Sequence, residues 1–157
     1  MELFLSVVVG GVNFRSAVIA CLLSAYIMWF LGIWLEGIFG LPRLDFAQFG
    51  KLYIGDRQGW WSVGMATHFL TKMVWGILYA WLASPPNVLS TMAQWLSGFL
   101  FGIVLGIVLV VVGAIGKSLG GKAFEYMPAR ANEQVFYVIL YGIFGFFVGV
   151  FYTVPTQ

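Results

Sequence analysis

Four long apolar stretches dominate the chain, and the shorter segments between them hold most of the charged residues. Each stretch is close to the roughly 20 residues that a helix needs to cross about 30 Å of hydrocarbon. Pro85-Pro86 follows the second stretch and predicts a tight turn before the third. The pattern therefore predicts an all-α integral membrane four-helix bundle, with residues 1–157 forming one transmembrane domain. We expect spans at about 16–35, 60–82, 89–115 and 132–152.

The segment before the first span is also apolar, from Leu3 to Val12. Joined to the first span, it would make a helix of roughly 50 Å at 1.5 Å per residue. We expect Gly10-Gly11 to break the chain, which leaves Met1–Asn13 at the interface or half inserted. The alternative is one long, strongly tilted helix with Arg15 inside it.

The connection between the first two spans, residues 37–59, mixes apolar and polar residues at nearly helical spacing. Leu44, Phe49 and Leu52 alternate with Asp45 and Lys51. Such a segment favours a short amphipathic helix on the inner leaflet, with its apolar side at the acyl boundary. We predict this interfacial helix at about 41–55. The alternative is a loop packed under the bundle.

Composition supports a lipid environment. Hydrophobic residues make up 61% of the 157 positions and charged residues 9%, and the mean hydropathy is +0.94. A soluble domain carries roughly 25% charged residues, so this chain has too few to cover a globule in water. The net charge of +2 is too small to indicate a nucleic-acid partner. A single cysteine, Cys21, excludes a disulfide framework within the chain.

The distribution of Lys and Arg predicts the orientation. Six lie in the first and third connections, and outside the spans one more, Arg15, flanks the N-terminal side. Because positive residues concentrate on the cytoplasmic side, we expect these two connections in the cytoplasm and both termini outside. The predicted location is the cytoplasmic (inner) membrane, as a multi-pass protein. The six residues are Arg43, Lys51, Arg57, Lys117, Lys122 and Arg130.

Glycine rows mark the third and fourth spans. Lipid tails are as apolar as leucine, so membrane helices associate by close packing, which small residues permit. We expect the two spans to pack backbone to backbone as an antiparallel pair; the alternative is that one row faces a partner subunit. The rows are Gly98, Gly102 and Gly106, and Gly142, Gly145 and Gly149.

His68 and Lys72 are the most informative polar positions. They lie four residues apart in the second span and share one helix face. Lys72 is about 18 Å along the helix from Trp60, close to the bilayer centre, where a lysine costs roughly 2.5–3.5 kcal/mol. Three interpretations are open. The lysine snorkels or is neutral, satisfied by hydroxyls, carbonyls and waters; it contacts an anionic group of a subunit, lipid or quinone-like ligand; or it belongs to a proton or ion pathway.

A cofactor at His68 is a weaker hypothesis. A membrane haem of the b type usually needs two histidines and this chain has one, so only a haem or chlorophyll-type pigment with one axial ligand fits. The alternative is a hydrogen-bonded interior histidine, and no cofactor is required. With one histidine and one cysteine, we expect no metal site within the chain.

A short pattern in the first 85 residues resembles a known family. The chain carries Gly10-Gly11, then Leu41-Pro42-Arg43-Leu44-Asp45, then His68, Gly76 and Tyr79-Ala80. This is similar to an uncharacterised family of small four-span prokaryotic membrane proteins. The resemblance singles out Asp45, His68, Gly76 and Tyr79 and implies no activity. Lys72 is not part of the pattern.

Two functions from different classes follow. The leading hypothesis is a non-catalytic accessory subunit of a larger membrane complex, such as one in electron transport or photosynthesis. It is motivated by the lack of a self-contained site together with an intramembrane lysine. The alternative is a small proton-linked transporter or channel that uses His68 and Lys72, with Asp45 as a cytoplasmic gate. We expect no catalytic residues, and membrane lipid and other membrane subunits, or a homo-oligomer, as partners. The residues we expect to contact a ligand or partner are His68, Lys72, Asp45 and Tyr79.

Overall fold

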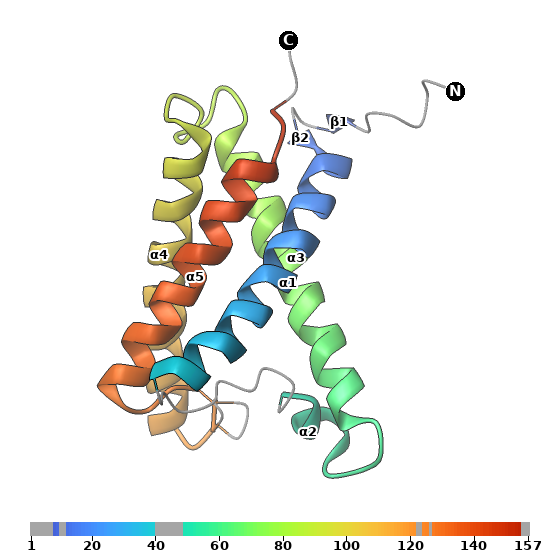
Figure 1. The fold of residues 1–157 in the computed structure, drawn as a ribbon, viewed down its shortest axis with the longest axis vertical. Coiled ribbons are helices and arrows are strands. Elements are labelled where there is room, and N and C mark those ends of the chain that lie inside the picture. Colours follow the sequence, from blue (N-terminus) through green and yellow to red (C-terminus); the bar gives the residue numbers. More distant parts are fainter. Residues whose placement is uncertain (1–7, 10–11, 40–48, 122–123, 126, 155–157) are drawn as a thin grey trace.

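The computed structural model describes residues 8–9, 12–39, 49–121, 124–125 and 127–154. Within these residues the chain is mostly helical, with four long helices, one short helix and one pair of two-residue strands (Figure 1). The elements are β1 Val8–Val9, β2 Val12–Asn13, α1 Phe14–Phe39, α2 Phe49–Ile54, α3 Trp60–Ala83, α4 Gln94–Ser118 and α5 Ala131–Phe151.

Three helices among the described residues are long and apolar enough to cross a membrane. They are the Phe14–Leu35 part of α1, Gln94–Ser118 and Ala131–Phe151. α3 is equally long at 24 residues, but it carries His68 and Lys72 and is less apolar. The fold is therefore that of a helical protein with three potential membrane-spanning helices.

The chain reverses direction before α1. β1 pairs antiparallel with β2, with Val9 opposite Val12, and α1 then begins at Phe14. The Asn13 side chain accepts a hydrogen bond from the Ser16 backbone N–H at 3.1 Å, which satisfies one of the N–H groups left open at a helix start. The alternative of one long helix running through from Leu3 is wrong, because the strand pair interrupts it.

α4 and α5 form the most extensive helix pair, and they are antiparallel. Both glycine rows lie in this contact: Gly98 lies against Gly145 and Gly149, and Gly102 against Tyr141 and Gly142. A Cβ atom added at Gly106 would come within 2.9 Å of the Val138 Cα. The absence of side chains at these positions is thus what lets the two backbones touch.

α1 packs against both α3 and α5, and it carries a buried row of mostly small residues. Positions three and four apart share one helix face, and every member of this row is fully buried. The opposite face of α1 exposes large apolar side chains such as Leu23, Phe30 and Trp34, as expected of a helix in contact with lipid. The buried row comprises Ala17, Ala20, Cys21, Ser24, Ala25 and Met28.

The beginning of α1, the end of α5 and the connection between α3 and α4 lie at one end of the molecule (Figure 1). The Thr153 N–H donates to the Ser16 hydroxyl at 2.7 Å, and the Asn13 N–H donates to the Tyr152 hydroxyl at 3.3 Å. α2 and the connection between α4 and α5 lie at the opposite end. We call these the terminal end and the α2 end.

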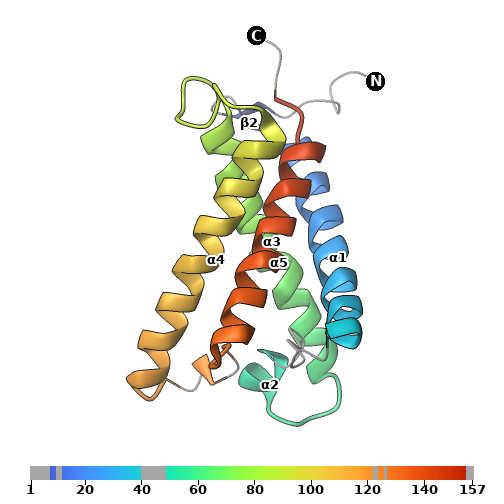
Figure 2. The same cartoon turned by 60° about the vertical axis from the view of Figure 1, so that its left-hand side comes forward.

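α3 and α4 diverge towards the α2 end. They are joined at the terminal end, where the Tyr79 hydroxyl donates to the Gln94 carbonyl at 2.9 Å. Both views show the two ribbons separating from there towards α2 (Figures 1 and 2). Their mutual contact is accordingly far smaller than that of α4 with α5.

α2 is held against the start of α3. A Cβ atom at Gly50 would collide with the Trp60 carbonyl and lie 2.6 Å from the Gly64 nitrogen. Lys51 pairs with Asp56 at 2.7 Å. α2 is the described part of the interfacial segment predicted at 41–55; residues 41–48, with Asp45, lie outside the described residues.

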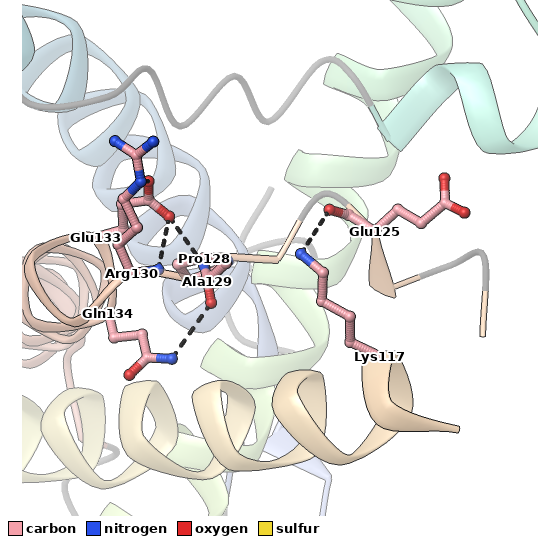
Figure 3. A network of polar contacts seen from close by, with 7 residues as sticks. All are labelled: Lys117, Glu125, Pro128, Ala129, Arg130, Glu133 and Gln134. Atoms are coloured by element: carbon pink, nitrogen blue, oxygen red, sulfur yellow. Dashed lines mark hydrogen bonds and ion pairs between the residues drawn. The ribbon is translucent and has the colours of Figure 1, made fainter. Parts of the chain in front are cut away.

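The connection between α4 and α5 is tied to both helices (Figure 3). The Glu133 carboxylate accepts the backbone N–H groups of Ala129 at 2.9 Å and Arg130 at 3.1 Å. Lys117, in the last turn of α4, donates to the Glu125 carbonyl at 3.3 Å. These contacts hold the chain that carries Phe124 and Met127 beneath the helices.

Candidate functional site

A cavity of about 280 Å³ lies among α3, α4 and α5, in the half of the molecule towards α2. α3 and α4, which diverge in this half of the molecule (Figure 2), both contribute to its lining. Five segments of the chain contribute to its wall. The lining residues are Leu52, Tyr53, Thr67, His68, Thr71, Lys72, Trp75, Leu109, Val112, Phe124, Met127, Tyr137 and Tyr141.

Lys72 lines the cavity from α3 and is only 1% exposed. Its Nζ atom lies 3.3 Å from the centre of the Tyr141 ring and 5.1 Å from the centre of the Phe144 ring. The negative face of an aromatic ring attracts an ammonium group, by about 0.5–2 kcal/mol for each such contact. Two side chains of α5 thus hold the lysine amine at the wall of the cavity.

His68 lies one helical turn before Lys72 and is 6% exposed. Its ring meets the edge of Phe69 at 5.5 Å between centroids, and it hydrogen-bonds the backbone of Ala25 in α1. The structure therefore brings His68 and Lys72 to one cavity wall, with His68 also anchored to α1. The haem or pigment alternative at His68 stays a prediction.

Two tyrosines of α5 complete the polar side of the cavity. The Tyr137 hydroxyl donates to the Tyr141 hydroxyl at 3.2 Å, and the rings lie 4.8 Å apart. That bond uses the Tyr137 proton and leaves the Tyr141 proton for another acceptor. The sequence interpretation did not include this pair, although two tyrosines four residues apart in an apolar span are a recognisable signal.

Among the remaining polar groups on α3, some hydrogen-bond donors have an acceptor and one does not. Thr67 donates its hydroxyl to the Val63 carbonyl at 2.9 Å, and Thr71 donates to the Thr67 carbonyl at 2.7 Å. The Trp75 indole nitrogen is buried and has no hydrogen-bond partner among the described residues. Trp75 was also missed, because a tryptophan in a membrane span is usually interpreted as packing.

The opposite wall of the cavity is apolar. Leu109 and Val112 come from α4, Leu52 from α2, and Phe124 and Met127 from the connection between α4 and α5. Lys72 supplies the charge on the lining, since the lining contains no Asp, Glu or Arg. The cavity therefore has one wall rich in hydrogen-bond donors and one wall that is apolar.

Tyr79, singled out from the sequence, lies outside this cavity. It is fully buried two helical turns beyond Lys72, towards the terminal end. Its hydroxyl lies 2.9 Å from both the Gln94 carbonyl and the Ser97 hydroxyl. Close by, the hydroxyls of Ser84 and Tyr152 are 3.0 Å apart. These buried hydroxyls join α3, α4 and α5, and we call them the terminal-end cluster.

Comparison with protein-family models, with curated proteins and with solved structures finds no match to this chain. The resemblance to a four-span prokaryotic family therefore stays a prediction. The fold and the site define a helical protein with three potential membrane spans and a partly polar cavity beside α3.

Proposed function

We propose that the protein is a small proton-linked transporter that binds its substrate in the cavity beside His68 and Lys72. The observation that supports this proposal is the position of the cavity. It extends from Tyr53 in α2 to Lys72 and Trp75 in α3, while the hydroxyls of the terminal-end cluster join α3, α4 and α5 nearer the terminal end. A transporter needs a central site that is accessible from one side and closed to the other.

In this proposal α3 is the fourth membrane span, and the protein is a four-helix bundle. α3 has 24 residues, about 36 Å at 1.5 Å per residue, which is enough to cross the hydrocarbon. The large side chains that it exposes are apolar, whereas His68 and Lys72 are buried. The ionisable groups of α3 thus face the other helices and its large exposed side chains are apolar, which suits a helix in lipid. The exposed side chains include Trp61, Leu70, Val74, Leu78 and Trp81.

The orientation proposed from the Lys and Arg residues determines the side of the membrane to which the cavity opens. The α2 end holds Lys51, Arg57, Lys117 and Arg130, and the start of α1 and the end of α5 lie at the terminal end (Figure 1). With the positive residues in the cytoplasm, the cavity opens towards the cytoplasmic half of an inner membrane. α2 then lies at the inner leaflet as the interfacial helix.

Proton flux into liposomes tests the proposal. The purified protein is reconstituted, a pH gradient is imposed, and an internal pH-sensitive dye reports the flux. We expect at least a tenfold lower protein-dependent flux with Lys72→Met and with His68→Phe, because each removes a group that can carry a proton at the cavity wall. Arg57→Met is the control, since Arg57 is an exposed cation between α2 and α3 that does not line the cavity. Unchanged flux in both cavity variants would end the transport proposal.

The accessory-subunit hypothesis stays a prediction, because nothing in the described residues favours a particular partner. Gentle extraction from the native membrane, followed by identification of co-purifying chains and an absorption spectrum, tests it directly. A companion subunit in constant proportion would favour the accessory role. A colourless protein without companions would favour transport.

A further inference from the structure

We infer that the cavity takes an amphipathic anion, a carboxylate or phosphate headgroup on an apolar chain, that enters sideways between α3 and α4. This inference names the substrate class for the proposed transport function and rests on it in that respect. The binding step itself follows from the cavity walls and can be tested without any transport. Three properties of the cavity support it: the donors on one wall, the apolar opposite wall and an exposed rim.

The donor wall suits an anionic headgroup. Lys72 supplies a positive charge, and the indole N–H of Trp75 and the hydroxyl of Tyr141 are hydrogen-bond donors on the same lining. The absence of Asp and Glu from that lining means that no fixed negative charge repels an anion. Hydrogen bonds from charged donors to a carboxylate or phosphate are roughly twice as strong as neutral ones.

The apolar wall suits a hydrocarbon chain. Leu109, Val112 and Met127 face the donor wall across the cavity and offer no polar side-chain atom except the methionine sulfur. A small hydrophilic anion would leave this surface without a partner, whereas an alkyl chain would remove it from water. The volume of about 280 Å³ lies just below the usual range for drug-sized ligands, about 300–1,000 Å³. It holds a headgroup and the first part of a chain, with the rest remaining in the bilayer.

The rim of the cavity points to lateral entry. Val112 on α4 is 47% exposed and Thr71 on α3 is also exposed, yet both line the cavity. They stand on the two helices that diverge in this half of the molecule (Figure 2). Val112 is about 9 Å along α4 from its end at Ser118, a depth that lies within the cytoplasmic leaflet in the proposed orientation.

Equilibrium binding of radiolabelled palmitate to the full-length protein in nanodiscs tests the inference. Hexadecanol has the same chain without the charge, and acetate and inorganic phosphate carry the charge without the chain. We expect saturable palmitate binding that none of these three displaces at equal concentration. Lys72→Met should weaken palmitate binding at least tenfold, and Trp75→Phe, which keeps an aromatic ring, by a smaller factor.

A pair of α4 variants tests the route of entry. Val112→Trp places a large side chain at the rim and should lower palmitate binding severalfold. Val104→Trp is the matched control, because Val104 is 59% exposed on the same helix and does not line the cavity. We expect unchanged binding for this control, and a monodisperse elution profile for every variant.

Each contrary result removes a defined part of the inference. Equal competition by hexadecanol would show that the headgroup is not recognised, and equal competition by acetate or phosphate would show that the ligand is a soluble anion. Equal binding by Val112→Trp and wild type would overturn lateral entry. Palmitate binding without proton flux would refute transport alone, and flux without palmitate binding would refute the substrate class alone.

Discussion

Replacing a glycine in the α4–α5 contact by alanine should weaken the fold. A Cβ atom at Gly102 would collide with the Tyr141 carbonyl oxygen and lie 3.1 Å from the Gly142 Cα. At Gly145 it would collide with the Gly98 carbonyl oxygen and lie 2.8 Å from the Gly102 Cα. In both cases the colliding atoms are backbone, which cannot rotate away, so the helices themselves must separate.

The size of the effect follows from these distances. Carbon atoms pack best at about 3.5–4.0 Å, so the backbones must move apart by roughly 1 Å. An added methyl group in a well-packed interior costs about 1–3 kcal/mol, and a backbone collision belongs in the upper half of that range. Alanine recovers about 0.8–1.0 kcal/mol of helix propensity over glycine. We therefore expect Gly102→Ala and Gly145→Ala each to lower the free energy of unfolding by about 1–2 kcal/mol.

Gly32→Ala is the matched control. Gly32 also lies in a helix that contacts α5, but its Cβ atom would lie 3.6 Å from the Leu140 Cδ1, an ordinary contact. The helix-propensity gain then has nothing to oppose it, and we expect about 0.5–1 kcal/mol of added stability. Unfolding in mixed micelles of rising dodecyl sulfate content, followed by circular dichroism, measures all three variants. Equal stability of Gly102→Ala and wild type, or an equal loss in Gly32→Ala, would refute the reasoning.

Two further predictions use the same unfolding measurement. Tyr79→Phe removes the hydroxyl that lies 2.9 Å from the Gln94 carbonyl and from the Ser97 hydroxyl, and should cost about 0.5–1.5 kcal/mol. Tyr26→Phe, at a position 55% exposed, should cost nothing measurable. Gly76→Ala directs a methyl group into the Cys21 sulfur and should cost about 1–3 kcal/mol. Cys21→Ala removes that sulfur, so the double variant should lose less than the sum of the single losses; strict additivity would contradict the contact.

Spacing along the sequence could predict which residues share a helix face. The separation of four between His68 and Lys72 places them on one face of α3, and both line the cavity. The spacing of the glycines likewise predicts that they share one face in α4 and one face in α5, and the structure places those two faces against each other. Such patterns are local, and a regular helix determines them from the chain alone.

Spacing along the sequence could not predict which face of a second helix packs against a given helix face. Tyr141 contacts Lys72 across 69 positions of sequence, and this pairing depends on how far α5 is shifted along α3. Phe124 and Met127 reach the cavity because contacts of Lys117 and Glu133 hold their connection in place. The tyrosine pair could have been marked as polar in an apolar span, but not assigned to Lys72. Tyr79, which the resemblance singles out and which we expect to contact a ligand or partner, belongs to the terminal-end cluster instead of the cavity.

The cavity follows from the same packing that makes the fold. Gly98, Gly102 and Gly106 of α4 all face α5, so the surface of α4 that allows the closest approach packs against α5 rather than α3. At the level of the cavity, α3 has bulky side chains on its inner face, and Lys72, His68 and Trp75 line the cavity. Side chains of this size prevent the α4 backbone from approaching closely. α4 and α3 therefore meet at the terminal end, where the Tyr79 hydroxyl lies against the buried Ser97. The polar residues of α3 thus keep α3 and α4 apart, while the glycines of α4 make α4 pack against α5. The cavity is the result of both effects.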